Sequence, residues 1–508
     1  MTAMNDANFY RLIMSRRPTD LSRPLIEWID RIYSWADMET ISTHFSTLLT
    51  SLGCMKGDRV VVQVDKSPAA LFLYLACLRA GLAFVPMNTA YHADEVEYRI
   101  RDAKPTVVVV SPAVAPLAES IASRYGIRHV LTLAANGSGS FPMSVPTVSC
   151  QPCPCAPDDV AAILYTSGTT GQPKGAVLSH RNLAVNGETL RTSWAFTADD
   201  ILLHALPIDH THGLFVACHC ALLSGARMIW LPAFDRTQVL VHLPRATVFM
   251  GVPTYYTRLL AMTDFTAATC TRMRLFVSGS APLLPETFLA FQRRTGHAIL
   301  ERYGMTETGM NTSNPYHGER QPGHVGKPLP GVSVRVVGVD GTLLPRGQIG
   351  VLQVRGDNVF LGYWEQPKEM NFTSDAWFIT GDLAYIGDDE TLTLVGRASD
   401  LIISGGYNVY PREVEQVINS LSGVIESAVI GLPHPDFGEA VVVVVQAGQN
   451  RPTTESILSS VRARLANYKV PKAIVFVDKL PHNPMGKVQK NLLRQTYATM
   501  FVATSVPS

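Results

Sequence analysis

The first half of the chain alternates short β-branched runs with longer amphipathic segments. Runs at 59–64, 83–86 and 106–111 have the length and apolar character of buried strands, and helical patterns occupy 69–80 and 93–102. Strands that are buried on both faces and joined by helices belong to parallel sheets. The alternation therefore predicts an α/β fold with helices on both faces of parallel-type sheets.

The length of the chain and a change of pattern predict more than one domain. Single hydrophobic cores stop growing near roughly 250–300 residues, and this chain has 508 residues. Over 332–395, short strands alternate with turns such as Asp340-Gly341, which predicts an antiparallel or barrel-like subdomain. After Gly396 a new α/β pattern begins, with Pro411 suited to the first position of a helix. We expect a large domain over 1–395, a hinge over 396–400 and a small α+β domain over 401–508.

Charge and hydropathy exclude several classes of partner. The formal net charge is +1, so no overall field attracts nucleic acid or an anionic membrane. The first 17 residues contain Asp6 and lack the apolar segment of an export signal. The most apolar stretch, 69–85, is interrupted by Arg79 and is shorter than the roughly 20 residues that span a bilayer. We expect a cytoplasmic protein with small-molecule partners, and the sequence leaves its oligomeric state open.

Two groups of cysteine and histidine residues invite a transition-metal interpretation. They are Cys150, Cys153 and Cys155 in a proline-rich stretch, and His210, His212, Cys218, His219 and Cys220 in an apolar one. Neither group is completed by a second Cys/His pair or a carboxylate at a spacing typical of zinc sites. The sequence therefore favours reduced thiols and no transition metal.

The segment 165–175 combines glycines, hydroxyls and one lysine directly after an apolar strand at 160–165. Glycines let backbone N–H groups converge on an anion, hydroxyls donate to phosphate oxygens, and Lys174 supplies a positive charge. A P-loop is excluded because Gly175 follows the lysine. A flexible linker is the alternative, although linkers seldom place Pro-Lys-Gly directly after a buried strand. The predicted phosphate ligands are Thr166, Ser167, Gly168, Thr169, Thr170, Gly171 and Lys174.

Together with segments farther along the chain, this loop resembles the adenylate-forming superfamily of acyl-CoA synthetases, peptide-synthetase adenylation domains and firefly luciferase. The resemblance covers essentially the whole chain, and the motifs occur in the family's order. It implies a mobile C-terminal domain and a two-step reaction. ATP first activates a carboxylic acid as an acyl-adenylate, and a thiol then displaces AMP. The implied ligands are ATP, Mg²⁺ and the co-substrate CoA.

The resemblance also assigns a nucleotide site. Tyr303 would stack on adenine, Thr306 would contact the α-phosphate, and Glu307 would hold Mg²⁺, which prefers oxygen ligands. Asp382 and Arg397 would bind the ribose hydroxyls. The other residues implied to line the nucleotide are Gly279, Ser280, Ala281, Glu301, Arg302 and Gly304, and Thr166 is a second candidate metal ligand.

The segment 481–487 resembles the family's late motif, whose lysine enters the active site during adenylation. Lys487 would neutralise the substrate carboxylate and the charge that develops at the α-phosphorus. The small domain would then swing, so that Lys487 leaves and Gly405-Gly406 line a thiol tunnel. The family's pivot is commonly Asp or Lys, but Ser399 occupies that position here. The pivot is therefore open between Ser399 and Asp400.

Fewer sequence motifs indicate the residues of the acid pocket. The segment 204–213 resembles the one that shapes the family's acyl pocket and places His210 against the substrate carboxylate. Arg258, on a predicted helix, would grip a second carboxylate in a bidentate way, or else would face solvent. Ser280 and Arg302 are further candidates for this role. These segments together are most similar to the malonyl-CoA synthetases, which implies malonate as substrate and methylmalonate as a secondary one.

Three other functions are alternatives to this one. The chain could be a CoA ligase for another short-chain or aryl acid. In that case Arg258→Ala should leave the kinetics with malonate unchanged. It could load a carrier protein, and since the sequence ends at Ser508 we expect such a carrier to act in trans. It could be a nucleotide-binding pseudoenzyme, which conflicts with intact Lys174, Glu307 and Lys487.

Overall fold

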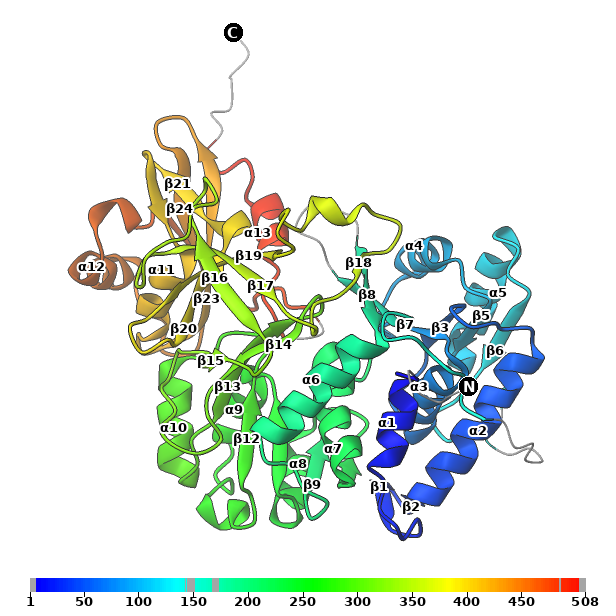
Figure 1. Cartoon of the computed structure of the whole chain (residues 1–508). Coiled ribbons are helices and arrows are strands. Elements are labelled where there is room, and N and C mark those ends of the chain that lie inside the picture. Colours follow the sequence, from blue (N-terminus) through cyan, green and yellow to red (C-terminus); the bar gives the residue numbers. More distant parts are fainter. Residues whose placement is uncertain (1–5, 142, 144–150, 167–172, 484–485, 502–508) are drawn as a thin grey trace.

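The structure, a computed structural model, describes residues 6–141, 143, 151–166, 173–483 and 486–501. Figure 1 shows a large N-terminal body, coloured blue through yellow, and a C-terminal lobe, coloured orange to red, that lies against its green and yellow part. The α/β fold class predicted from the sequence is confirmed.

The first of two large sheets has seven strands. They are, in order across the sheet, β18 (Gly362–Tyr363), β8 (Lys174–Ser179), β7 (Val160–Thr166), β4 (Ala83–Pro86), β3 (Arg59–Gln63), β5 (Val107–Val110) and β6 (His129–Thr132). The strands from β4 to β6 are parallel, as the sequence predicted. β7 is parallel to β4 but antiparallel to β8, and β18 extends the edge as a further antiparallel strand.

The second large sheet has nine strands. They are, in order, β15 (Lys327–Pro328), β14 (Gly309–Ser313), β13 (Leu300–Met305), β12 (Leu275–Ser278), β11 (Val248–Gly251), β9 (Ile201–His204), β10 (Arg227–Trp230), β1 (Pro24–Trp28) and β2 (Arg31–Ser34). The strands from β13 to β1 are parallel, and β14, β15 and β2 add antiparallel edges. The carboxyl ends of β12 and β13 lead into the motifs that the sequence assigned to the nucleotide and the acid.

Helices cover both large sheets. The α-helices of the N-terminal body are α1 (Phe9–Ser15), α2 (Trp35–Ser51), α3 (Pro68–Ala80), α4 (Ala93–Ala103), α5 (Ala115–Arg124), α6 (His180–Ser193), α7 (His219–Ser224), α8 (Arg236–His242), α9 (Pro253–Leu260) and α10 (Pro285–Thr295). Short helices of other types are η1 (Pro112–Val114), η2 (His212–Cys218), η3 (Leu243–Arg245), η4 (Ala267–Cys270) and η5 (Lys368–Met370), of which η2 is a π-helix.

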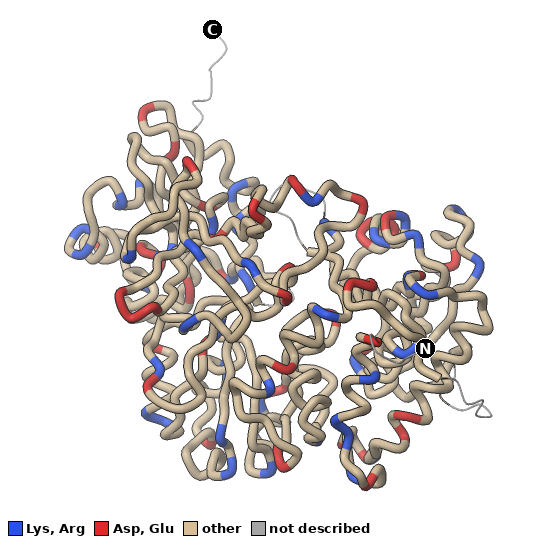
Figure 2. The backbone as a smooth tube through the Cα atoms, in the orientation of Figure 1, with Lys and Arg blue, Asp and Glu red and all other residues tan. Residues whose placement is uncertain are grey.

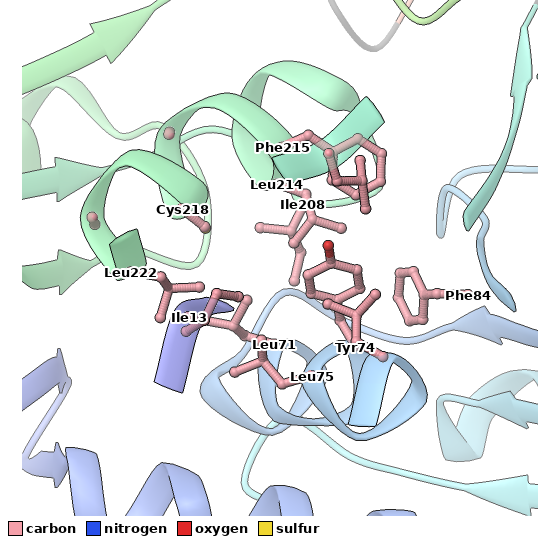
Figure 3. Close-up of a cluster of buried hydrophobic side chains, with 14 of the residues drawn as sticks. Ile13, Leu71, Tyr74, Leu75, Phe84, Ile208, Leu214, Phe215, Cys218 and Leu222 are labelled. Carbon is pink, nitrogen blue, oxygen red and sulfur yellow. The ribbon is translucent and has the colours of Figure 1, made fainter. Parts of the chain in front are cut away.

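The apolar helix α3 lies in the main core. The Ser67 side chain caps its first turn, and Gly81 ends it at φ 70°, a conformation that suits glycine. Figure 3 shows Leu71 and Tyr74 of α3 packed between Ile13 of α1 and Phe215 of η2. Residues 69–80 of the apolar stretch therefore form a core helix, as predicted, and residues 83–85 belong to β4. No helix in the described ranges is long and apolar enough to cross a membrane.

The predicted change of pattern after residue 332 corresponds to a four-stranded antiparallel sheet. Its strands are, in order, β16 (Ser333–Val337), β17 (Gly350–Arg355), β19 (Phe378–Ile386) and β20 (Leu392–Arg397). The short helix η6 (Ala398–Asp400) follows β20 and leads into the C-terminal lobe.

The C-terminal lobe has its own sheet and its own apolar clusters. Its elements are β21 (Ile402–Ser404), β22 (Tyr407–Val409), α11 (Pro411–Asn419), β23 (Val424–His434), β24 (Gly438–Ala447), α12 (Thr454–Arg464), η7 (Asn467–Lys469), β25 (Ala473–Val477) and α13 (Lys490–Thr496). Pro411 is the first residue of α11, as predicted. Buried residues of β23 and β24 contribute to both apolar clusters of the lobe. Figure 2 shows acidic and basic residues interspersed along both lobes, as expected for a net charge of +1.

Candidate active site

The phosphate loop joins two antiparallel strands. Thr166 at the end of β7 pairs with Lys174 at the start of β8, and the Thr166 hydroxyl donates to the Lys174 carbonyl over 3.4 Å. Both ends of the loop are thus held by one hairpin. The predicted ligands Ser167, Gly168, Thr169, Thr170 and Gly171 lie outside the described residues.

Glu307 lies beside this hairpin. Glu307 is 5% exposed, its carboxylate accepts a hydrogen bond from the Tyr363 phenol at 2.8 Å, and the Thr166 side chain lies near the same carboxylate. Burial raises the pKa of Glu307, whereas Tyr363 and Thr166 act in the opposite direction. The two predicted metal ligands, Glu307 and Thr166, are therefore brought together as oxygen donors. Tyr363 was not predicted from the sequence.

The predicted adenine and ribose residues also meet. The Tyr303 phenol donates to Asp382 over 2.5 Å, and the Arg397 guanidinium forms an ion pair with the same carboxylate at 2.9 Å. Asp382 and Arg397 are direct partners in the β19–β20 ladder, so the backbone fixes their approach. Arg397 also donates to the Thr380 carbonyl. The separate motifs thus form one polar cluster.

A second cationic group is buried next to the turn after β12. Arg302 is 4% exposed, and its Nε and Nη2 atoms have no hydrogen-bond partner among the described residues. A Cβ added at Gly279 would lie 2.3 Å from the centre of this guanidinium, so only glycine leaves room for it. Burial lowers the pKa of Arg302 to about 10. The side chain remains a cation at neutral pH and has no counter-ion among the residues that the structure describes.

Two polar side chains border the Arg302 site. The Ser280 hydroxyl lies 3.2 Å from Nδ1 of His212, at the start of η2, and Ser280 has the unusual φ of 71°. The Nε2 atom of His212 and the hydroxyl of Ser278 have no partner within the described part of the chain. Burial and then Arg302 lower the pKa of His212, so its imidazole is neutral. The cluster is rich in donors and short of acceptors, which suits an anionic ligand.

The other two predicted acid-binding residues are less enclosed. His210 is partly exposed, and its ring pairs at 3.4 Å with Asp209, which accepts a hydrogen bond from Asn88. Arg258 lies near the end of α9 and is exposed. Of the two arginines proposed for a second carboxylate, Arg302 is therefore the buried one.

Lys487 lies between β25 and α13 in the C-terminal lobe. The Asn483 side chain accepts from the Lys487 N–H at 2.9 Å, and a Cβ at Gly486 would lie 3.2 Å from the Thr254 hydroxyl at the start of α9. Lys487 is exposed, yet desolvation by its surroundings and then nearby Arg397 lower the pKa of its amine. The lysine is thus near both the ribose cluster and the acid pocket.

The residues predicted for the hinge and for the thiol tunnel lie at the start of the C-terminal lobe. Asp400 in η6 forms an ion pair with Arg494 of α13 at 2.7 Å, whereas Ser399 is exposed. Gly405 and Gly406 form the exposed turn between β21 and β22, with φ of 58° and 81°. Both conformations favour glycine.

The remaining residues predicted to line the nucleotide lie in β13 or in the turns after β12 and β13. Gly304 packs against the carbonyl of Gly309 in the β13–β14 hairpin, and Thr306 and Ala281 are partly exposed in the turns after β13 and β12. Glu301 accepts a hydrogen bond from the Gly323 N–H, and burial raises its pKa to about 7.

No group of three or more potential metal-binding His, Cys, Asp or Glu residues occurs in the described ranges. The thiols described there, including Cys153, Cys155, Cys218 and Cys220, are free.

Comparison with known proteins places this geometry in a family. Residues 18–364 match the family model "AMP-binding enzyme", and residues 413–487 match "AMP-binding enzyme C-terminal domain". The mitochondrial malonate–CoA ligase ACSF3 of Mus musculus is 37% identical over an alignment of 491 residues, which covers 88% of this chain and 83% of that protein.

Two solved structures of MatB from Rhodopseudomonas palustris are also similar. Each is 48% identical and is covered over its whole length by 98% of this chain. The TM-score is 0.95 against the ATP-bound form and 0.82 against the apo form, so the arrangement described above is more like the ATP-bound one. The chain belongs to the AMP-binding, adenylate-forming family of enzymes.

Proposed function

We propose that this enzyme is a malonate–CoA ligase that forms malonyl-CoA, AMP and pyrophosphate from malonate, ATP and CoA. The acid is activated as malonyl-adenylate, and methylmalonate is a secondary substrate. One observation carries the choice of acid: a buried, unpaired guanidinium at Arg302 borders the adenylate site. Such a group requires an anion, and a dicarboxylic acid supplies one that a monocarboxylic acid lacks.

Different residues bind the nucleotide and the reacting carboxylate during adenylate formation. Tyr303 stacks on adenine, and Asp382 and Arg397 hold the ribose. Lys487 and His210 hold the reacting carboxylate near the α-phosphate. Charge neutralisation by Lys487 allows one anion to attack another and stabilises the charge that develops at phosphorus.

The donor set at Glu307 and Thr166 fits a magnesium ion. Both residues offer oxygen atoms, which are the ligands that Mg²⁺ prefers, and Glu307 is held in a buried position next to the phosphate hairpin. When bound, the ion neutralises phosphate charge. For the second step, the Gly405-Gly406 turn is the segment proposed to admit the thiol arm of CoA, after a movement at Ser399–Asp400.

A panel of acids tests the substrate assignment. The enzyme is incubated with ATP, Mg²⁺, CoA and one acid at a time, and AMP release and thioester mass are measured. Malonate is expected to give the highest kcat/KM, methylmalonate a lower one, and propionate or benzoate values near background. A higher kcat/KM for a monocarboxylic acid would reject malonate as the substrate. The same panel with a carrier protein in place of CoA identifies the acceptor.

Arg258→Ala tests the outer side of the pocket. We expect kcat/KM for malonate to fall about tenfold, because an exposed arginine contributes less than a buried one to holding a carboxylate. Turnover of propionate should stay at its wild-type level. Unchanged malonate kinetics would leave Arg258 as a surface residue of α9.

Gly279→Ala tests the space around Arg302. The added Cβ would overlap the guanidinium and displace it, so we expect kcat/KM for malonate to fall at least tenfold. Circular dichroism should show an intact fold. Wild-type activity in this variant would contradict the fixed position of Arg302.

A further inference from the structure

We propose that Tyr363 is a positioning residue for the end of the site that binds Mg²⁺ and the ATP phosphates. Its phenol fixes the carboxylate of Glu307, and its ring supports the ammonium group of Lys174. The proposal rests on the proposed use of Mg²⁺ and ATP by this enzyme, and it adds a residue that the sequence motifs did not include.

The contacts of Tyr363 join two groups of different function. Its hydroxyl donates to Oε1 of Glu307 at 2.8 Å, and Nζ of Lys174 lies 5.2 Å from the centre of its ring. Lys174 is thus within the range of a cation–π contact. One side chain therefore touches both a predicted metal ligand and the predicted phosphate-binding lysine.

The backbone holds Tyr363 independently of its hydroxyl. In β18, Tyr363 pairs with Ala176 of β8, two residues after Lys174. On either side, Trp364 donates its N–H to the Gly175 carbonyl at 2.7 Å, and Phe360 donates to the Glu307 carbonyl at 2.8 Å. The segment 360–364 thus links the phosphate hairpin to the turn that carries Glu307. Removal of the hydroxyl alone should leave this link intact.

A hydrogen bond to one carboxylate oxygen restricts the orientation of the other. A buried glutamate without such a partner can rotate, and a cation then has to order it on binding. Partners that orient metal ligands typically change metal affinity by about 10–100-fold. We place Tyr363 at the lower end of this range, because Thr166 also contacts Glu307.

The test compares wild type with Tyr363→Phe and a matched control. Tyr125→Phe removes the same kind of bond, a phenol that donates to Glu97 at 2.8 Å on the exposed surface between α5 and α4. ATP binding is measured by calorimetry, without acid or CoA, over a series of Mg²⁺ concentrations. In Tyr363→Phe the Mg²⁺ concentration for half-maximal enhancement of ATP affinity should rise about tenfold. ATP affinity without metal should stay within about twofold, because the ring below Lys174 remains. The control should match wild type.

Two results would overturn the proposal. One is a wild-type Mg²⁺ dependence in Tyr363→Phe, and the other is an equal loss of ATP affinity with and without metal, which indicates a structural role only. A double-mutant cycle with Glu307→Gln gives an independent check: Tyr363→Phe should add no further loss of Mg²⁺ dependence once the Glu307 charge is gone. If wild type itself binds ATP without any Mg²⁺ dependence, the assumed metal requirement fails, which is a different outcome from failure of Tyr363 alone.

Discussion

Lys487→Ala is expected to slow formation of malonyl-adenylate by about 10²–10³-fold, the usual effect of losing a group that stabilises transition-state charge. Conversion of supplied malonyl-adenylate to malonyl-CoA should stay within severalfold of wild type. The reason is positional. Gly486, next to Lys487, lies beside Thr254 of α9 in the ATP-bound-like arrangement, and the thiol step is proposed to use the Gly405-Gly406 turn of the same lobe instead.

The two half-reactions are measured separately. Malonate-dependent exchange of pyrophosphate into ATP reports the first, and thioester formation from synthetic malonyl-adenylate and CoA reports the second. Lys490→Ala is the matched control, because Lys490 is a nearby lysine that forms an ion pair with Glu415 at 2.6 Å. We expect it to change the exchange rate by less than about fivefold. An equal fall of both half-reactions in folded Lys487→Ala would contradict the role given to this lysine.

Arg302→Met is expected to lower kcat/KM for malonate by about 10²-fold or more, since loss of one member of a buried charge pair costs about 2–5 kcal/mol. Activity with propionate should be kept or should rise. Thermal stability should not fall together with the activity. Methionine has a similar length and removes a buried charge that has no counter-ion within the described ranges of the chain, so the thermal midpoint should stay the same or increase.

Kinetics and thermal denaturation together separate the possible outcomes for Arg302. A loss of malonate activity with a retained or raised midpoint supports a carboxylate-binding role. A lowered midpoint with an equal loss for malonate and propionate would make Arg302 a structural residue. Arg302→Lys, which keeps the charge but not the planar fork, should recover part of the malonate activity.

Much of the fold was predictable because its signals are local. Parallel strands at β3, β4 and β5, the core helix α3 and the start of α11 at Pro411 all follow from short patterns of apolar residues, glycine and proline. The family was predictable for a related reason. Its phosphate, ribose and lysine motifs are short segments with fixed spacing, and the structure brings Asp382 and Arg397 into contact as those motifs imply.

The parts that were not predicted depend on contacts between distant segments. The phosphate loop closes an antiparallel hairpin, which its composition does not reveal. Tyr363 reaches Glu307 through a strand of two residues, too short for any periodic pattern. The sequence placed Arg258 ahead of Arg302 for the second carboxylate, because burial of Arg302 depends on the space left by Gly279 and on the packing of β12 against β13.

Transfer of labelled oxygen tests the adenylate route on malonate most directly. Malonate labelled with ¹⁸O in its carboxylates is converted with ATP, Mg²⁺ and CoA, and the nucleotide and phosphate products are analysed by mass spectrometry. Attack of the carboxylate on the α-phosphorus predicts AMP with one ¹⁸O atom and unlabelled pyrophosphate. Label in inorganic phosphate with formation of ADP, or unlabelled AMP, would contradict it.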